Sequence, residues 1–422
     1  MPTSDFLHPP KKPFHIAVVG GGIAGLTITL ALLEQGIPVT LYEAASKFGE
    51  IGAGVSFGPN ASRAMKLISP EIYDGFQNRA TCNQSQDKSG NWFSIQYGED
   101  LGQGDLITEL QCEGGHAAVH RAHFLDELVH LLPEGSMQFK KRAIAYEQDD
   151  QGVTIKFQDG TEAKHDALIG CDGIKSKMRL CLLGEQDPAS RPVYSGKYAY
   201  RGLIPMVQAK ELLGEEKAQN SQMYYGRNGH LLTFSIEKGK TMNVVAFSSS
   251  ESWDSADWVV TADKEKMYSD FSSWNPTVRN ILSLVEKPDI WALFQHPNAR
   301  TYADGNVALL GDSAHATTPH QGAGAGMCVE DSYIMSNLLG EVQDKKDIAK
   351  AFAVYDQVRR PRSQNLVKTS REAGMLYEME LVGEEREKIK ANLENRMKWL
   401  WDYDIEGELK VAKTLLEKAM MV

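Results

Sequence analysis

FHIAVVGGGIAGLTITLALLEQGIPVTLYE, residues 14–43, reads as a buried strand, a glycine-rich turn, an amphipathic helix and a second strand that ends on Glu43. Gly20 permits the tight turn, Gly22 lets backbone N–H groups approach a pyrophosphate, and Gly25 allows the helix to pack closely on the strand. Glu43 can then accept hydrogen bonds from ribose hydroxyls. The stretch predicts a dinucleotide site, and by itself it does not separate NAD from FAD.

A second block, GNVALLGDSAHATTPHQGAGAGMCVEDSYIMSNLL at residues 305–339, has the features of a partner surface. An apolar strand delivers Asp312 to a loop, and a buried carboxylate is costly unless it accepts hydrogen bonds, for which nucleotide hydroxyls are suitable donors. Gly322, Gly324 and Gly326 remove side chains from the start of the next helix, so backbone N–H groups can face an electron-rich ring. The block predicts a second contact surface for phosphate and flavin.

A third motif, LIGCDGIKSKMR at residues 168–179, ends a strand on Asp172 and continues into a helix. In isolation this is a common strand–turn–helix. It lies between the other two motifs in the sequence, and Gly20, Asp172 and Asp312 each follow a predicted strand. This arrangement favours a role for the third motif in the same site. We expect all three at the carboxyl edge of a mostly parallel sheet, where such sheets bind ligands.

Composition limits the class of protein. The chain has 422 residues, of which 42% are apolar, and Lys+Arg of 45 against Asp+Glu of 56 gives a net charge of −11. This balance argues against binding to nucleic acid or to an anionic membrane. Five cysteines without a CxxC pair favour reduced thiols, a cytoplasmic location and no metal. The apolar run at 16–33 is broken by glycines, so we do not expect it to span a membrane.

The rest of the chain changes pattern near residue 340. Segments 152–160, 167–173, 231–236 and 242–247 have the alternation or clustering of apolar residues expected of strands. From about 340 onward, helical spacing predominates, with Pro361 as the main expected interruption. The polar first thirteen residues are expected to form a frayed tail.

Taken together, the motifs resemble those of the class A flavoprotein aromatic hydroxylases, and within them the fungal-type salicylate hydroxylases. The resemblance covers nearly the whole chain. It rests on a series of segments in family order and at family spacing: GGGIAGL (20–26), EIGAGVSFGPNA (50–61), VHRAHFLDEL (119–128), CDGIKSKMR (171–179), KYAYRGLIP (197–205), GDSAHATTPHQGAGAGMCVEDS (311–332) and WLWDYD (399–404).

The resemblance implies non-covalently bound FAD. The residues implied to hold it are Gly20, Gly22, Gly25, Glu43, Gly54, Arg121, Asp172, Gly311, Asp312, Gly322 and Gly324. Cys171 and Ser313 depart from the alanine that is commoner in the family. The chain has one strand–GxGxxG–helix unit, so NADH or NADPH is expected to bind transiently as co-substrate; the resemblance favours NADH.

The implied chemistry is transfer of hydride to FAD and then hydroxylation of an aromatic carbon by O₂. A phenol must become phenolate-like for this reaction, which calls for a base and a cation. Candidates are Arg201, His230 and His320, with Pro319 framing the oxygen-reacting face and Tyr225 as a further substrate contact. Arg201 could instead form a structural salt bridge, and His230 could be an ordinary turn residue.

The predicted architecture is α/β, with a Rossmann-like FAD-binding domain interleaved with a β-sheet substrate domain. The FAD-binding domain comprises 14–75, 106–185 and 295–345, the substrate domain 76–105 and 186–294, and a helical region 346–422. The leading hypothesis is hydroxylation of salicylate to catechol with loss of CO₂, by a monomer or homodimer. Alternatives are another arene (a polyketide phenol or anthranilate-like amine), an FAD oxidase or reductase without oxygen insertion, and, least favoured, a non-enzymatic binding protein.

Overall fold

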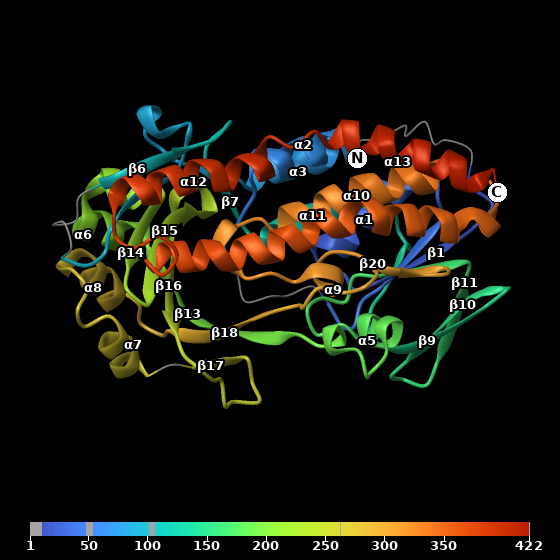
Figure 1. Cartoon of the computed structure of the whole chain (residues 1–422), viewed down its shortest axis with the longest axis horizontal. Coiled ribbons are helices and arrows are strands. Elements are labelled where there is room, and N and C mark those ends of the chain that lie inside the picture. The colour runs from blue at the N-terminus through green and yellow to red at the C-terminus, as the bar shows by residue number, and fades with distance from the viewer. Residues whose placement is uncertain (1–10, 48–53, 101–105, 262, 422) are drawn as a thin grey trace.

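A computed structural model of the chain describes residues 11–47, 54–100, 106–261 and 263–421. Two large sheets lie at opposite ends of an elongated molecule, and the C-terminal helices run along both (Figure 1). The α/β fold class is confirmed. The predicted domain boundaries stay a prediction, although two strand pairs cross them: β5 (Asn91–Tyr97) with β6 (Leu106–Gln111), and β4 (Thr81–Cys82) with β7 (Ala117–His120).

The six-stranded sheet carries the glycine-rich turn. Its order is β19 (Ala303–Asp304), β20 (Val307–Leu309), β12 (Ala167–Gly170), β1 (Ile16–Val19), β2 (Val39–Tyr42) and β8 (Met137–Gln138). All neighbours pair parallel except β19 and β20. The prediction of a mostly parallel sheet is confirmed. Parallel strands are covered on both faces, which explains why all four residues of β1 are buried.

The eight-stranded sheet forms the other end of the molecule. Its order is β17 (Val259–Thr261), β18 (Asp289–Gln295), β13 (Val193–Pro205), β16 (Thr241–Ser249), β15 (Gly229–Ile236), β14 (Gln222–Gly226), β5 (Asn91–Tyr97) and β6 (Leu106–Gln111). Only the pair of β14 with β5 is parallel. Two three-stranded sheets complete the strands: β9 (Ala143–Asp149), β10 (Gly152–Phe157) and β11 (Glu162–His165), and β3 (Gly54–Ser56), β7 (Ala117–His120) and β4 (Thr81–Cys82).

Helices cover the first sheet and bridge to the second. Those near the site are α1 (Ile23–Glu34), α2 (Pro59–Ile68), α4 (Arg121–His130), α5 (Lys177–Leu183), α9 (Asp312–His315), η4 (Pro319–Gln321) and α10 (Gly324–Glu341). The C-terminal helices are α11 (Ile348–Tyr377), α12 (Arg386–Trp401) and α13 (Ile405–Met420), and the peripheral ones are α3 (Pro70–Arg79), α6 (Met206–Gln219), α7 (Lys264–Asp270) and α8 (Pro276–Ser283). The predicted C-terminal helical region is confirmed.

Three details differ from the sequence predictions. Helix α1 is not amphipathic, because α10 packs over it and every residue from Leu26 to Leu32 is buried. Pro361 does not interrupt α11, which continues past it with buried side chains on both sides, so tertiary packing outweighs the missing backbone N–H. Strand β6, predicted within the FAD-binding segments, pairs with β5 in the eight-stranded sheet.

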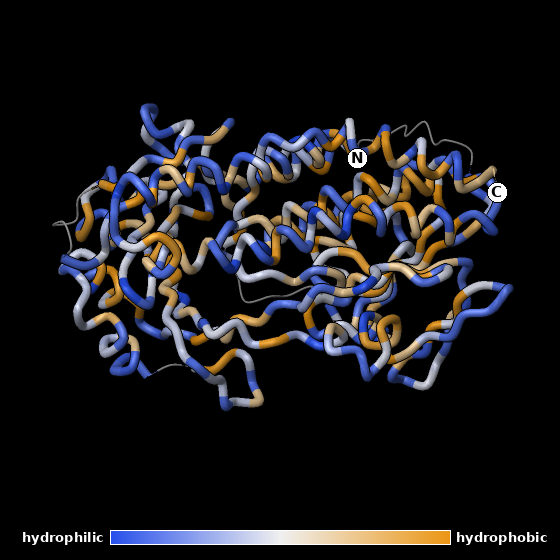
Figure 2. The backbone as a smooth tube through the Cα atoms, viewed as in Figure 1, coloured by the Kyte–Doolittle hydropathy of each residue, from blue (hydrophilic) through white to orange (hydrophobic). Residues whose placement is uncertain are grey.

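The hydrophobic core follows these layers. Hydrophobic colour concentrates on the strands and helices of the interior, whereas the outer turn of the β9–β10 hairpin is hydrophilic (Figure 2). Across the described ranges, no helix combines the length and the apolar character that a membrane crossing requires. The cytoplasmic location and the monomeric or dimeric state stay predictions.

Candidate active site

Three loops leave neighbouring strands of the six-stranded sheet at one edge. Gly20 follows β1, Asp172 follows β12 and Asp312 follows β20, and these strands are adjacent and parallel. All three loops therefore lie beyond the carboxyl ends of their strands, where sheets of this kind bind ligands. The predicted convergence of the three motifs is confirmed.

The glycine-rich turn has two glycines at which a side chain would clash with the backbone and one glycine at which a side chain would fit. Gly20 has φ +105°, and a Cβ there would lie 2.3 Å from the carbonyl oxygen of Cys171. A Cβ on Gly25 would lie 1.8 Å from the carbonyl oxygen of Gly20. Gly22 differs, because its nearest neighbour would be an Arg121 guanidinium nitrogen at 3.6 Å. Gly20 and Gly25 are thus required by packing, whereas Gly22 leaves room at the start of α1.

Glu43 is fixed against this turn. The Gly21 N–H donates to Glu43 Oε2 at 2.7 Å, and the Ala45 N–H donates to Oε1 at 2.6 Å. A carboxylate oxygen accepts more than one hydrogen bond, so both oxygens keep capacity for a hydroxyl. The two backbone donors thereby orient the carboxylate beside the glycine turn.

Asp172 organises the second loop through hydrogen bonds. Its carboxylate accepts hydrogen bonds from the Ser176 hydroxyl at 2.5 Å, the Lys177 N–H at 2.7 Å and the Met178 N–H at 3.1 Å, which organises the start of α5. Arg179 of the same helix is fully buried and donates to backbone carbonyls that include those of Ser313 and Ala314. This arginine ties the second loop to the third. Its role was not predicted from the sequence.

Asp312 begins α9, and its side chain is exposed to the inner cavity near Arg121, the first residue of α4. Desolvation within this recess raises the pKa of Asp312, and His315 and Arg121 only partly offset this effect. Burial lowers the pKa of Arg121, partly offset by Asp312. Gly311 before it has φ +68°, and a Cβ there would lie 2.8 Å from the Cβ of Ala24. The close approach of the third loop to α1 therefore requires glycine.

These loops border two connected recesses. The outer groove, of about 770 Å³, is lined by residues that include Gly20, Glu43 and Asp172. The inner cavity, of about 350 Å³, lies between the two large sheets and includes Asp312 and Arg201 in its wall. Both recesses share four lining residues: Gly22, Arg121, Cys171 and Gly173. A long ligand can thus occupy the groove with one end and the cavity with the other.

The inner cavity has two unlike walls. The loop that leads into α10 supplies Pro319, His320, Gly322 and Gly324. The inner face of the eight-stranded sheet supplies a mostly apolar wall: Trp92, Phe93, Arg201, Met223, Leu232, Phe234, Val245 and Phe247. Gly54 of β3 also lines the cavity, where a Cβ would lie 2.6 Å from the ring of Phe234. An apolar chamber with few polar groups is typical of a small-molecule site.

Arg201 is the cation of this chamber. It lies on β13 opposite Val245, and its guanidinium stacks on the Trp291 ring with the central carbon 4.5 Å from the ring centre. Its Nε is buried without a hydrogen-bond partner. Within the described ranges, no acidic side chain forms an ion pair with it, so the structural salt bridge is not found. Burial, aided by Arg121, lowers the pKa of Arg201 to about 10, which leaves it charged at neutral pH.

His320 lies on the opposite wall. Both of its ring nitrogens are buried and lack a partner within the protein. Burial lowers the pKa of His320 well below its usual value, so the imidazole is neutral, with a ring nitrogen that has a free lone pair. A neutral base and an unpaired guanidinium therefore line one apolar chamber.

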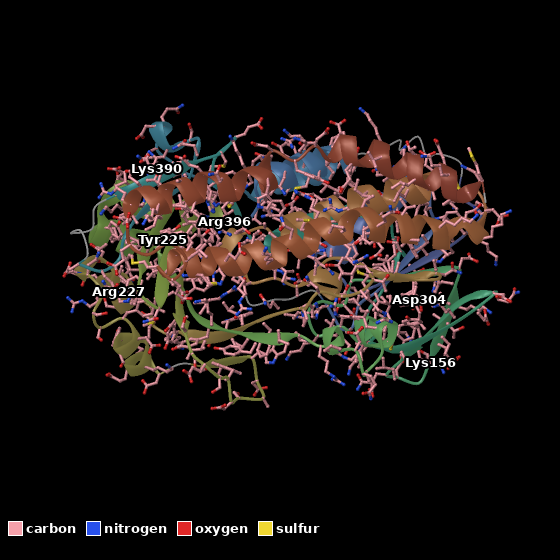
Figure 3. All side chains as sticks on the ribbon, viewed as in Figure 1. Lys156, Tyr225, Arg227, Asp304, Lys390 and Arg396 are labelled. Carbon is pink, nitrogen blue, oxygen red and sulfur yellow. The ribbon has the colours of Figure 1, made fainter. Side chains whose placement is uncertain are left out.

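Two residues predicted to bind substrate lie behind the chamber wall. The ring of His230 stacks on Phe247 at 4.2 Å, and that of Tyr225 stacks on Tyr377 at 4.9 Å. Neither lines the inner cavity as the structure defines it. Tyr225 shares a sheet face with Met223 but lies one step further along β14, where Tyr377 of α11 covers it; Figure 3 labels Tyr225 among the strands of this sheet. The geometry does not favour direct substrate contact for either residue.

Two groups of buried charges were missed by the sequence analysis. The first lies behind His320 and joins His230, which the sequence analysis does name, to Lys197 and Glu378, which it does not. Lys197 lies on the same face of β13 as Arg201, four residues earlier, and this inward spacing was the available signal. The second, the buried arginine cluster, lies between α10, α11 and α13 and comprises Asn60, His315, Glu330, Asp331, Arg359, Arg362 and Glu408.

The chain is similar in sequence and in fold to known FAD-dependent proteins. Residues 122–370 match a family described as "FAD binding domain". The chain is 40% identical over 410 residues to 6-methylsalicylate 1-monooxygenase of Aspergillus terreus, covering 95% of this chain and 92% of that protein. It is 40% identical over 423 residues to a salicylate hydroxylase of Pseudomonas putida, covering 96% of each. A solved salicylate hydroxylase substrate complex superposes with a TM-score of 0.86 at 37% identity, covering 95% of this chain and 98% of that one.

The chain belongs to the FAD-dependent aromatic monooxygenases of the salicylate hydroxylase type. Its cofactor is FAD, and its reaction uses O₂ and a reduced nicotinamide. The oxidase, reductase and passive binding alternatives are thereby set aside.

The residues present fit FAD. The open position at Gly22 and the donors of the α1 start face the junction of groove and cavity, where a pyrophosphate can pass. Glu43 offers acceptors for ribose hydroxyls in the outer groove, and Asp312 offers an acceptor in the inner cavity. The described residues contain no group of three or more His, Cys, Asp or Glu side chains arranged to hold a metal ion.

Proposed function

We propose that this enzyme hydroxylates salicylate to catechol with loss of CO₂. The balanced reaction is salicylate anion, NADH, O₂ and two protons to catechol, CO₂, NAD⁺ and water. The observation that carries the proposal is the presence of two groups in one apolar chamber: Arg201, a half-buried guanidinium with no ion-pair partner among the described residues, and the neutral imidazole of His320. A phenol that bears a carboxylate supplies the partner that each of these residues lacks.

The protein's own groups would act as follows. Arg201 binds the carboxylate or the developing phenolate through charge-assisted hydrogen bonds, and its stacking on Trp291 fixes the plane of the guanidinium. His320 accepts the phenolic proton, which raises the electron density of the ring. The apolar wall of Met223, Leu232 and Phe247 orients the arene and excludes water. When bound, FAD supplies the redox chemistry, taking hydride from NADH and activating O₂.

The test is product analysis across a panel of phenolic acids. Salicylate should give catechol and CO₂, with one atom of labelled oxygen from ¹⁸O₂ in the product. A second candidate, 6-methylsalicylate, is favoured by the name of the Aspergillus terreus relative. Faster turnover of 6-methylsalicylate would transfer the proposal to that substrate, and turnover only of arenes without a carboxylate would overturn it.

Arg201→Ala should weaken salicylate binding without changing flavin content. Removing a guanidinium that pairs with a buried anion costs on the order of 2–5 kcal/mol, or roughly 30- to 4,000-fold in affinity. Arg201→Lys should recover only part, because a point charge does not reproduce bidentate geometry. The measurement is titration of flavin fluorescence with salicylate. The matched control is Arg227→Ala, an exposed arginine of the same end of the molecule (Figure 3), which pairs with Glu384 and should leave affinity unchanged.

A further inference from the structure

Behind His320 lies a chain of buried polar groups that the hydroxylation step described above does not use. Glu378, just after α11, contacts Lys197 Nζ through Oε2 and His230 Nδ1 through Oε1, the latter at 3.1 Å. Both Glu378 and His230 have fully buried side chains, and that of Lys197 is 9% exposed. A buried ion pair gives little net stability compared with apolar side chains of the same size. Its position behind the base suggests a different use.

The inner end of this chain meets the active site. The His230 and His320 rings lie 5.2 Å apart between centres. Nε2 of His230 and both ring nitrogens of His320 lack partners in the protein. His320 lines the inner cavity and His230 does not. From the chamber towards Glu378, the imidazole of His320 therefore comes first and that of His230 second.

The outer end reaches solvent. Lys197 Nζ lies 3.3 Å from Glu380 Oε1, and the side chain of Glu380 is 40% exposed. The Ser249 hydroxyl donates to Glu378 Oε2 at 2.9 Å and lies 3.1 Å from Lys197 Nζ. The remaining titratable group beside His230 is Tyr377, whose pKa burial raises, so it stays protonated. Polar contacts therefore continue from His230, behind the cavity wall, to the surface.

We propose that His230, Glu378, Lys197 and Glu380 form a proton-exit path, through which His320 passes the phenolic proton to solvent. The proposal rests on the proposed phenolic substrate. Burial alone would raise the pKa of Glu378, but His230 and Lys197 outweigh it and lower the value to about 2, so the carboxylate is ionised at working pH. Burial lowers the pKa of His230, which is therefore neutral and can relay a proton.

The proton balance is simple. The phenolic O–H breaks as its proton joins one nitrogen of His320, and the proton on the other nitrogen moves to Nε2 of His230 through an intervening water, since the two rings share no direct hydrogen bond. The Nδ1 proton of His230 then moves to Glu378, and Lys197 takes a proton from Glu378 as it releases one to Glu380 and solvent. Each group regains its starting charge. The path ionises the phenol while the apolar chamber stays closed to bulk water.

The experiment follows phenol ionisation without turnover. A nitro-substituted salicylate, whose phenolate absorbs visible light, is mixed with oxidised FAD-loaded enzyme, and phenolate formation is timed by stopped-flow difference absorbance. Glu378→Gln keeps the size and the acceptor for Lys197 but removes the proton-accepting charge. It should slow ionisation by about 100-fold, the lower range for a positioned proton-transfer group. Glu380→Gln should slow it less, and exposed Glu384→Gln is the matched control that should not change it.

The outcomes separate the two hypotheses. A purely electrostatic role for Glu378 predicts the opposite sign, because loss of a nearby negative charge favours phenolate and does not slow its formation. If Glu378→Gln and Glu380→Gln both bind the probe tightly and ionise it at an unchanged or faster rate, the proton-exit path is overturned and the proposed substrate class is not. Failure of the wild-type enzyme to bind the probe, judged by flavin fluorescence, would overturn the proposed substrate class and the path with it. If Glu378→Gln does not fold, the Glu380→Gln rate decides.

Discussion

Gly22→Val is expected to yield folded protein that has lost most of its FAD. Gly22 has φ −74° and ψ −174°, which any residue adopts, and a Cβ there would approach only the guanidinium of Arg121, at 3.6 Å. The valine side chain would instead project into the junction of the outer groove and inner cavity, where the pyrophosphate is proposed to pass. The measurement is flavin absorbance per protein after gel filtration, with far-UV circular dichroism as the test of folding.

Gly25→Ala provides the contrast for that experiment. A Cβ at this position would lie 1.8 Å from the carbonyl oxygen of Gly20, so the strand-to-helix packing itself must shift. This variant should lose thermal stability as well as flavin, whereas Gly22→Val should lose flavin only. Full flavin absorbance in Gly22→Val would show that the cofactor does not pass this glycine.

Arg359→Ala should destabilise the fold by about 3–5 kcal/mol. The guanidinium contacts three carboxylates: Asp331 at 2.9 Å, Glu330 at 2.8 Å and Glu408 at 2.7 Å. Asp331 and Glu330 are almost fully buried, so removal of the arginine leaves negative charge that water cannot solvate. Urea denaturation monitored by circular dichroism gives the free energy of unfolding. Arg360→Ala, which breaks a partly exposed pair with Asp356, is the matched control and should cost less than about 1 kcal/mol.

The same cluster predicts a pH dependence. Burial raises the pKa of Asp331, but His315 and Arg359 outweigh it and lower the net value; in Glu330, Arg359 and Arg362 likewise outweigh burial. Carboxylates with lowered folded-state pKa values stabilise the protein above their unfolded pKa of about 4, and this stabilisation is lost as the pH falls below that value. In Arg359→Ala these carboxylates stay buried without their partner, which raises their folded-state pKa, so the variant should lose less stability than the wild type, or regain some, as the pH falls towards 4. An identical pH profile in the two proteins would contradict the assignment.

The parts of the site that follow strands were predictable from the sequence. Gly20, Asp172 and Asp312 each follow an apolar segment, and parallel strands necessarily present their carboxyl ends at one edge. Arg201 was identifiable because a guanidinium within an apolar strand needs an anion or a stacking partner, and the structure supplies Trp291 as the latter. These inferences depend on local pattern, which a single sequence contains.

The parts that depend on packing between distant segments were not predictable. The sequence around His230 predicts a substrate contact. It does not reveal that the ring of Phe247 stacks on His230 from the neighbouring strand, or that Glu378, 148 residues later, forms a hydrogen bond with it. The same holds for Tyr225, because Tyr377 from a distant part of the chain stacks on it. Pro361 predicts an interruption of the helix, but α11 continues through it with buried residues on both sides. In each case a residue far along the chain decides the environment.

The two unlike walls of the inner cavity have a consequence for how such enzymes diversify. The loop wall, with Pro319 and His320, belongs to the cofactor end, whereas the wall that would face the arene comes from strands of the other sheet. Substitutions at Met223, Leu232 or Val245 can change the shape of the chamber without disturbing the glycine turn. Mutations that change substrate choice can thus arise without affecting FAD binding. A mutant library confined to the sheet wall should yield enzymes with new specificities that all retain bound flavin and its yellow colour.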